Sequence, residues 1–234
     1  MDIQTIGSGS SGNCYLIKDN ETAILLEAGI KFEKVQQALQ FRTRQIKCVL
    51  VTHEHGDHSA YVNDYLKNGL NVYMTAGTKS ALGIEHHRLF TVEYKTVFKI
   101  GSLTIMPFET QHDVAEPCGY LVKSDAGSKL LFATDTYYIK YKFPCITHML
   151  LEVNHDYDYM MENVANGHLH QGLANRIMKS HLNLENAIKY LQSSDLNDLK
   201  EIHLIHLSNS NSKANEFKEK IQKVTGVPVK IAGV

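Results

Sequence analysis

Four potential metal ligands lie within six residues of this chain: His53, His55, Asp57 and His58. They come directly after residues 48–51, an apolar run typical of a buried strand. Alternate side chains of an extended segment face the same way, so His53 and His55 can bind one cation. Asp57 and His58 follow a glycine that lets the chain turn, and they can serve a second cation close by. Two-metal hydrolases use this arrangement.

Further potential ligands follow later apolar strands in the same manner. They are His112, Asp135, Glu152 and His206. In layered α/β proteins, strand ends at one edge of a sheet converge on one site. One or two such residues could arise by chance, whereas five in order, counting His53, indicate a functional site.

The composition is that of an ordinary globular protein of 234 residues, with 43% apolar residues and a formal net charge of −1. No overall positive field is available to recruit nucleic acid or an anionic membrane. Residues 1–4 resemble no signal peptide, and no apolar run approaches the roughly 20 residues that span a bilayer. The four cysteines are far apart, which favours reduced thiols in a cytoplasmic protein. The oligomeric state is left open.

Hydrophobic periodicity predicts strands alternating with helices, and therefore a sheet covered by helices. In the first half we expect strands at 1–6, 14–17, 22–26, 46–51 and 70–74, with helices at 32–39 and 59–67. In the second half we expect strand pairs at 92–98 with 103–107 and 118–123 with 129–133. Strands at 146–151, 201–205 and 228–231 and helices at 168–179, 184–193 and 212–224 complete the chain. No repeat or linker is evident, so one domain over residues 1–234 is predicted.

A glycine- and serine-rich stretch, residues 7–13, separates the first two predicted strands. Its glycines permit close backbone approach, and its hydroxyls and amides could hold a phosphate, with Ser11 and Asn13 as candidate substrate contacts. It matches neither a Walker A loop nor a dinucleotide-binding loop, because a strand rather than a helix follows. A tight hairpin turn is an equally good interpretation.

Residues 53–58 meet in full the signature H-x-H-x-D-H, and the chain resembles the metallo-β-lactamase superfamily. Finer features resemble small bacterial proteins of the YycJ/WalJ type, relatives of RNase Z and RNase J. They include residues 7–13, 112–120, 134–136, 152–156 and 206–208, so the resemblance covers nearly the whole chain. It implies an α/β fold: a four-layer αβ/βα sandwich with two mixed sheets flanked by helices. It also makes Ser208 a candidate substrate contact.

The resemblance implies two divalent metal ions. One would be bound by His53, His55 and His112, and the other by Asp57, His58 and His206, with Asp135 bridging them. A hydroxide between the metals would be the nucleophile, and Asp57 could orient it or accept its proton. Zinc and manganese suit this ligand mixture, and iron is possible.

His181 and Glu152 resemble an additional His/Glu pair of the RNase Z group, in which the imidazolium would protonate the leaving oxygen. The alternative makes His181 a solvated helix-flanking residue and Glu152 an ordinary polar residue at a strand end. The chain also departs from the family: Glu27 stands where an aspartate usually supports the loop of residues 53–58, here called the His-rich loop. The stretch between Asp135 and His206 is too short for a β-CASP domain, which excludes an RNase J-like channel.

Two-metal phosphodiester hydrolysis of nucleic acid, resembling that of a DNA exonuclease, is the leading interpretation. Local support comes from the basic pairs Lys140/Lys142 and Arg42/Arg44, with Tyr137, Tyr138 and Tyr141 near the first pair for base stacking. An ordinary solvated surface explains the same residues. The alternative hydrolase would act on a cyclic phosphodiester, lactone or thioester. A di-iron redox protein and a non-catalytic metal-binding module are more remote alternatives.

Overall fold

The computed structural model describes residues 1–20 and 22–233, which form two compact units. Unit 1 contains the described residues of 1–109 together with 114–128 and Gly233. Unit 2 contains residues 110–113 and 129–232. Within the described part of the chain, no helix is both long and apolar enough to cross a membrane. The single domain expected over residues 1–234 stays a prediction.

Unit 1 contains a six-stranded mixed sheet with the strands in sequence order. The first three strands pair antiparallel and the last four pair parallel. β3 is buried along its whole length, as expected of a strand inside a sheet covered on both faces. The strands are β1 (Asp2–Gly7), β2 (Cys14–Asp19), β3 (Thr22–Leu26), β4 (Ile46–Leu50), β5 (Asn71–Thr75) and β6 (Leu89–Val92).

Helices pack on this sheet through apolar residues at helical spacing. Phe32 and Val35 of α1 and Val62, Tyr65 and Leu66 of α3 belong to the same buried core as the strands. Three further strands of unit 1 form an antiparallel meander. The remaining elements are α1 (Phe32–Ala38), α2 (Gly56–Ser59), α3 (Val62–Lys67), α4 (Ala76–Leu82), β7 (Phe98–Ile100), β8 (Leu103–Glu109) and β9 (Cys118–Ser124), with a 3-10 turn at Thr43–Gln45.

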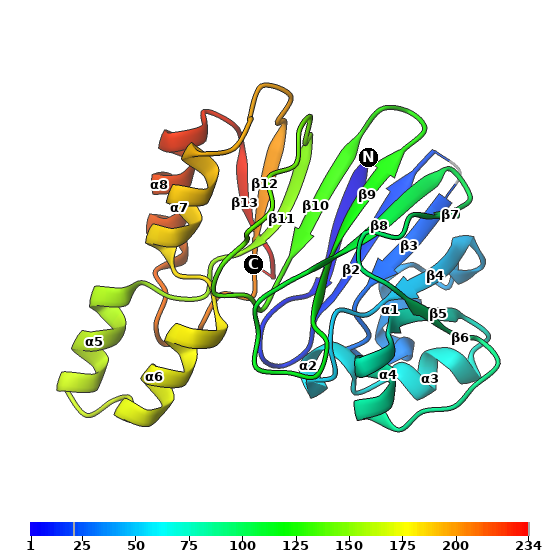
Figure 1. Cartoon of the computed structure of the whole chain (residues 1–234), viewed down its shortest axis with the longest axis horizontal. Coiled ribbons are helices and arrows are strands. Elements are labelled where there is room, and N and C mark those ends of the chain that lie inside the picture. Colours follow the sequence, from blue (N-terminus) through cyan, green and yellow to red (C-terminus); the bar gives the residue numbers. More distant parts are fainter. Residues whose placement is uncertain (21, 234) are drawn as a thin grey trace. The chain divides into compact units, whose positions relative to one another are not determined.

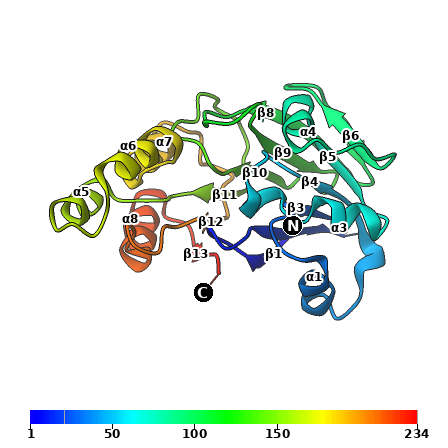
Figure 2. The same cartoon turned by 90° about the horizontal axis from the view of Figure 1, so that it is seen from below.

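Unit 2 is built on four parallel strands and four helices of its described residues (Figure 1). α8 packs against β13 and α7 packs against α8, as both views show (Figures 1 and 2). The strands are β10 (Lys129–Ala133), β11 (His148–Glu152), β12 (Glu201–Ile205) and β13 (Val229–Ile231). The helices are α5 (Tyr157–Ala165), α6 (Gln171–Ser180), α7 (Leu184–Gln192) and α8 (Ala214–Thr225).

The predicted strand at 92–98 is wrong. Its apolar and polar residues alternate as in a strand, but Lys95 turns the chain at a φ of 63°, and its N–H donates to the Pro107 carbonyl. The segment is therefore the end of β6, a turn and the start of β7. Two helices, α4 and α5, were also not expected. Each begins at a side-chain cap, Thr75 and Asp156 respectively.

Three polar residues that follow strands have left-handed backbone conformations. Glu27 after β3 has a φ of 72°, Asp135 after β10 has 47°, and His206 after β12 has 52°. This conformation costs residues other than glycine about 1–2 kcal/mol of free energy. Such conformations persist where surrounding contacts determine them, and they concentrate at functional sites. The hydrogen bonds of these three side chains provide those contacts.

Candidate active site

Glu27 anchors the His-rich loop of unit 1 from beneath. This carboxylate is fully buried, and its two oxygens accept hydrogen bonds from Thr52, at 2.7 Å from the hydroxyl and 3.2 Å from the backbone N–H. The Thr52 hydroxyl lies 2.8 Å from Nδ1 of His53. Because the hydroxyl donates to Glu27, it accepts from Nδ1–H, which makes Nε2 the nitrogen of His53 with a lone pair. Glu27 thus sets the tautomer that a metal ligand needs.

The same carboxylate reaches His58, whose Nδ1 lies 3.4 Å from Glu27 Oε1. The glutamate therefore supports the His-rich loop at two points, the role that the family resemblance assigned to an aspartate. The histidine rings of the loop gather closely. The centroid of His53 lies 4.2 Å from that of His58 and 4.9 Å from that of His55.

Asn13 holds the opposite side of this loop. Its amide nitrogen lies 3.3 Å from Asp57 Oδ2 and 3.2 Å from His58 Nε2, while its backbone N–H donates to the Asp57 carbonyl. Its amide oxygen accepts from Gly9 and from the Tyr15 hydroxyl. Asn13 is fully buried, and its hydrogen bonds position the His-rich loop.

Residues 7–13, here called the serine-rich loop, come close to the end of β3 and to α2 through their backbones. A Cβ added at Gly29 would lie 1.7 Å from the carbonyl oxygen of Asp57. Gly12 has a φ of 136°, and a Cβ there would lie 2.3 Å from the Gly29 carbonyl oxygen. Only glycine fits either position, so these residues let Asn13 reach Asp57.

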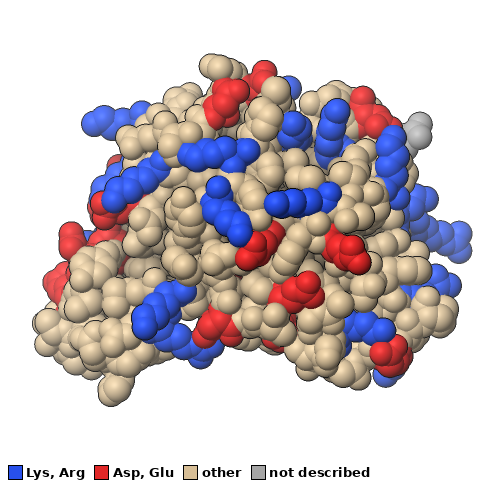
Figure 3. Space-filling view, viewed as in Figure 1, with Lys and Arg blue, Asp and Glu red and all other residues tan. Residues whose placement is uncertain are grey.

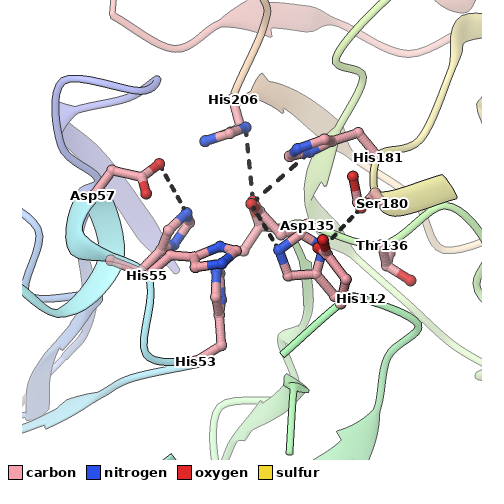
Figure 4. Close-up of polar contacts among 12 residues, drawn as sticks. His53, His55, Asp57, His112, Asp135, Thr136, Ser180, His181 and His206 are labelled. Carbon is pink, nitrogen blue, oxygen red and sulfur yellow. Dashed lines mark hydrogen bonds and ion pairs between the residues drawn. The ribbon is translucent and has the colours of Figure 1, made fainter. Parts of the chain in front are cut away.

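Unit 2 gathers three imidazoles around Asp135 (Figure 4). The carboxylate lies 3.7 Å from Nε2 of His112, 3.8 Å from Nδ1 of His181 and 3.6 Å from Nδ1 of His206. Thr134 donates a hydrogen bond of 2.8 Å to the same carboxylate. Asp135, His206 and the His112 side chain are all buried. His112 is oriented by Ser180, whose carbonyl lies 3.0 Å from Nδ1, so Nε2 is its lone-pair nitrogen.

Glu152 is fully buried in unit 2 and contacts four hydrogen-bond donors. Its Oε2 accepts backbone hydrogen bonds from Thr136 at 3.0 Å and Leu182 at 3.2 Å. Its Oε1 lies 2.6 Å from Nδ1 of His181 and 3.3 Å from Nδ1 of His206. Four donors use the full accepting capacity of a carboxylate. Glu152 therefore orients both histidines and is ill suited to bind a metal ion itself.

Charge and burial oppose each other in this pair. Burial alone would raise the pKa of Glu152, but the charge of His181 and the hydrogen bonds from His181 and His206 hold it below its usual value. Burial would lower the pKa of His181, but the charge and hydrogen bond of Glu152 raise it above its usual value. Both shifts favour the charged pair, an ionised carboxylate beside an imidazolium, which is the form that a general acid needs.

The donor sets of both units fit divalent metal ions. Nε2 of His112 lies 3.7 Å from Oδ2 of Asp135, which exceeds hydrogen-bond length. This separation approaches the roughly 3–3.5 Å between two ligands bonded to one ion at about 2.0–2.1 Å. His206 also lies beside Asp135, with its side chain buried next to that carboxylate. Gathered imidazoles and carboxylates of this kind suit Zn²⁺, Mn²⁺ or Fe.

The other predicted site residues have varied surroundings. Ser11 is exposed in the serine-rich loop. Ser208 is partly buried after β12, where its hydroxyl accepts from the backbone N–H of Asn211. No role was predicted for the positioning residues Thr52 and Asn154, although Thr52 directly precedes the H-x-H-x-D-H signature and Asn154 lies within residues 152–156. Asn154 donates to the His206 carbonyl at 3.0 Å and so supports that residue's left-handed conformation.

A comparison with protein families matches residues 22–206 to the beta-lactamase superfamily domain. The match covers more than half of the chain, which therefore belongs to this superfamily. With its histidine and aspartate clusters, the chain is a hydrolase of the metallo-β-lactamase type. The resemblance of the sequence to this superfamily is thus confirmed.

The curated relatives include two bacterial nucleases. Exodeoxyribonuclease WalJ of Streptococcus pneumoniae strain D39 is 28% identical over 224 residues, covering 88% of this chain and 81% of the pneumococcal protein. Exodeoxyribonuclease YycJ of Bacillus anthracis is 27% identical over 228 residues, covering 91% of this chain and 84% of that protein. The similarity thus extends over most of each sequence.

Two solved structures establish the fold. The metallo-β-lactamase fold protein YhfI from Bacillus subtilis has a TM-score of 0.76 at 16% identity, covering 99% of this chain and 97% of that one. The short form of human tRNase Z has a TM-score of 0.63 at 14% identity, covering 100% and 96%. The predicted α/β metallo-β-lactamase fold, with two mixed sheets flanked by helices, is confirmed.

Proposed function

We propose that this protein is a metal-dependent phosphodiesterase that hydrolyses DNA from an end. The contact of 2.6 Å between His181 and Glu152 carries the proposal, because cleavage of DNA releases an alkoxide that needs a proton. The names of the relatives from S. pneumoniae and B. anthracis support DNA as the substrate. Phosphodiester cleavage would place a poor leaving group beside a residue suited to protonate it.

We also propose that both donor sets serve one centre with two metal ions. This rests on family membership and on the ligand chemistry of each unit. The proposed ligands are His53, His55, Asp57, His58, His112, Asp135 and His206. When bound, paired divalent cations lower the pKa of a water molecule and neutralise charge developing on the attacked phosphorus.

Asp57 and two further side chains, His181 and Glu152, have proposed roles in the reaction. Asp57, whose carboxylate is only partly buried, orients the attacking water or accepts its proton. His181 donates a proton to the leaving oxygen from Nε2, because Nδ1 faces Glu152. Glu152 orients the imidazole and keeps it charged, which assigns it a role through His181.

The net charge of −1 gives the protein no broad attraction for a polynucleotide. Lys and Arg side chains are interspersed with Asp and Glu over the face in Figure 3, in keeping with the net charge of −1. Binding of a phosphate backbone must therefore depend on local groups. The serine-rich loop with Ser11, and Ser208 after β12, are proposed substrate contacts.

The test is a panel of end-labelled single- and double-stranded DNA and RNA, incubated with Mn²⁺ or Zn²⁺. We expect DNA to be shortened from one end by the wild-type protein and to stay intact with Asp135→Ala. No cleavage above that variant would contradict the nuclease proposal. Hydrolysis of a cyclic phosphodiester, lactone or thioester in a parallel panel would then support a small-molecule hydrolase.

A further inference from the structure

A pocket of about 340 Å³ opens in unit 2 between the segment after β10 and the helix α7. The residues that matter for its chemistry are Tyr138, Lys142, Leu182, Asn186, Lys189 and Tyr190. Pockets for small ligands usually range from about 300 to 1,000 Å³, so this one suits a ligand of about one nucleotide. Neither predicted metal ligands nor His181 line it.

The pocket is electropositive. Two lysines line it, and among the residues that the structure describes no aspartate or glutamate does. Lys142 is held by a hydrogen bond to Ser193 and lies 5.4 Å from the ring centroid of Tyr190. Lys189 is paired at 2.7 Å with Glu185, and both side chains are largely exposed, so this ion pair is weak and exchangeable. A phosphate group fits this environment.

The pocket also offers a surface for an aromatic base. Tyr138 is 55% exposed, which is unusual for so large a side chain and leaves its ring available for stacking. Ile139 and Leu182 provide buried apolar lining, and the amide of Asn186 adds a hydrogen-bonding group. Aromatic stacking beside cationic groups is the usual means by which proteins bind single-stranded nucleic acid.

The walls of the pocket are tied to the proposed acid. Leu182 directly follows His181, and its N–H donates to Glu152. On the other wall, the Thr136 N–H donates to the same carboxylate, and the Thr136 hydroxyl donates to the Tyr138 carbonyl at 2.8 Å. Both walls of the pocket are therefore held by Glu152, the carboxylate that also orients the proposed acid His181.

We propose that this pocket binds one nucleotide of a single-stranded DNA end, with the base on Tyr138 and a phosphate between Lys142 and Lys189. This inference rests on the proposed nuclease function and adds the strand form and the contact residues. It predicts a preference for single-stranded ends, since a paired base cannot stack on Tyr138.

The test compares Tyr138→Ala and Lys142→Gln/Lys189→Gln with two matched variants in the same unit. Tyr157→Ala removes an equally prominent tyrosine, which is 47% exposed on α5. Lys220→Gln/Lys223→Gln removes two charges from α8, one of them paired with a glutamate four residues earlier. Binding is measured by fluorescence anisotropy with labelled oligo-dT carrying phosphorothioate linkages, which resist cleavage. Hydrolysis is measured with single-stranded DNA and with bis(p-nitrophenyl) phosphate.

We expect Tyr138→Ala to weaken oligonucleotide binding and raise the KM for DNA by about tenfold or more, whereas Tyr138→Phe retains stacking and changes binding by less than about threefold. The double lysine variant should make the plot of log affinity against log salt concentration shallower by roughly 0.7, because one phosphate is no longer neutralised. Hydrolysis of bis(p-nitrophenyl) phosphate should be unchanged in all variants, because they leave the metal ligands intact. The matched variants should behave as the wild type.

If the wild type cleaves DNA but the pocket variants bind and cleave it equally well, the pocket proposal is wrong and the nuclease function stands. If the wild type cleaves neither substrate, the nuclease proposal fails, and the binding data still decide the pocket. Weaker binding in the pocket variants would then support a nucleotide site, and unchanged binding would overturn it.

Discussion

Nδ1 of His181 lies 2.6 Å from Oε1 of Glu152, while Oε2 of that carboxylate accepts two backbone N–H groups. These backbone contacts fix the carboxylate independently of the imidazole. Two roles for His181, as a metal ligand and as a general acid, predict different results. If it were a metal ligand, its removal would reduce metal content, whereas removal of an acid would affect only the leaving-group step.

His181→Ala should lower the rate of DNA hydrolysis by about 10²–10⁴-fold, the usual contribution of general acid catalysis. Hydrolysis of bis(p-nitrophenyl) phosphate should fall by less than about tenfold, because p-nitrophenolate leaves without being protonated. Steady-state rates on both substrates, with metal content measured on the same samples, check this. An equal decrease on both substrates, or a lower metal content, would assign His181 to the metal centre.

Glu27→Asp should weaken metal binding by about 10–100-fold, as changes behind metal ligands commonly do. The shorter side chain cannot keep the contacts with both Thr52 and His58 that Glu27 makes. Metal affinity is measured by competition with a chromophoric chelator, with Glu33→Asp on the surface of α1 as control. Tighter binding in Glu27→Asp would show that the longer side chain is a compromise rather than a support.

Several candidate site residues could be picked out from the sequence because they follow apolar strands. In parallel strands such as β10, β11 and β12, residues at or just past the carboxyl ends lie at the same edge of the sheet. Asp135, Glu152 and His206 are therefore placed by local sequence once the strands are recognised. Contacts such as that between Glu152 and Leu182 depend on how distant segments pack, and no local pattern encodes them.

Tertiary contacts also explain the wrong prediction at residues 92–98. Apolar and polar residues alternate over 92–98 as in a strand. The hydrogen bond from the Lys95 N–H to the Pro107 carbonyl instead holds the middle of this segment in a turn. The role of Asn13 as a substrate contact stays a prediction, and its hydrogen bonds to Asp57 and His58, which are 44 and 45 residues away in sequence, could not be predicted. The left-handed conformation of Glu27 was also beyond prediction, because only tertiary contacts make it tolerable for a glutamate.

The stability of the protein should fall between pH 7 and pH 5, in part because of His148. This residue at the start of β11 is 6% exposed, and burial is the main cause that lowers its pKa from 6.5 to about 4. Below pH 6.5 the unfolded chain binds a proton that the folded chain excludes, so acid favours unfolding until the pH reaches about 4. The effect is about 1–2 kcal/mol at pH 5.

Urea unfolding of the wild type and His148→Gln at pH 7.5 and 5.0 measures this effect. The decrease in stability on acidification should be smaller in His148→Gln, while a variant of the exposed His87 should behave as the wild type. An equal decrease in wild type and His148→Gln would show that this imidazole does not contribute.

The central claim is that ligands from both units serve one centre with two metal ions. Elemental analysis of the purified protein by mass spectrometry, after removal of loosely bound ions, tests it most directly. We expect about two divalent ions per chain, fewer in both His55→Ala and His206→Ala, and a parallel decrease in activity. One ion per chain with full activity, or an unchanged metal content in both variants, would contradict the two-metal centre.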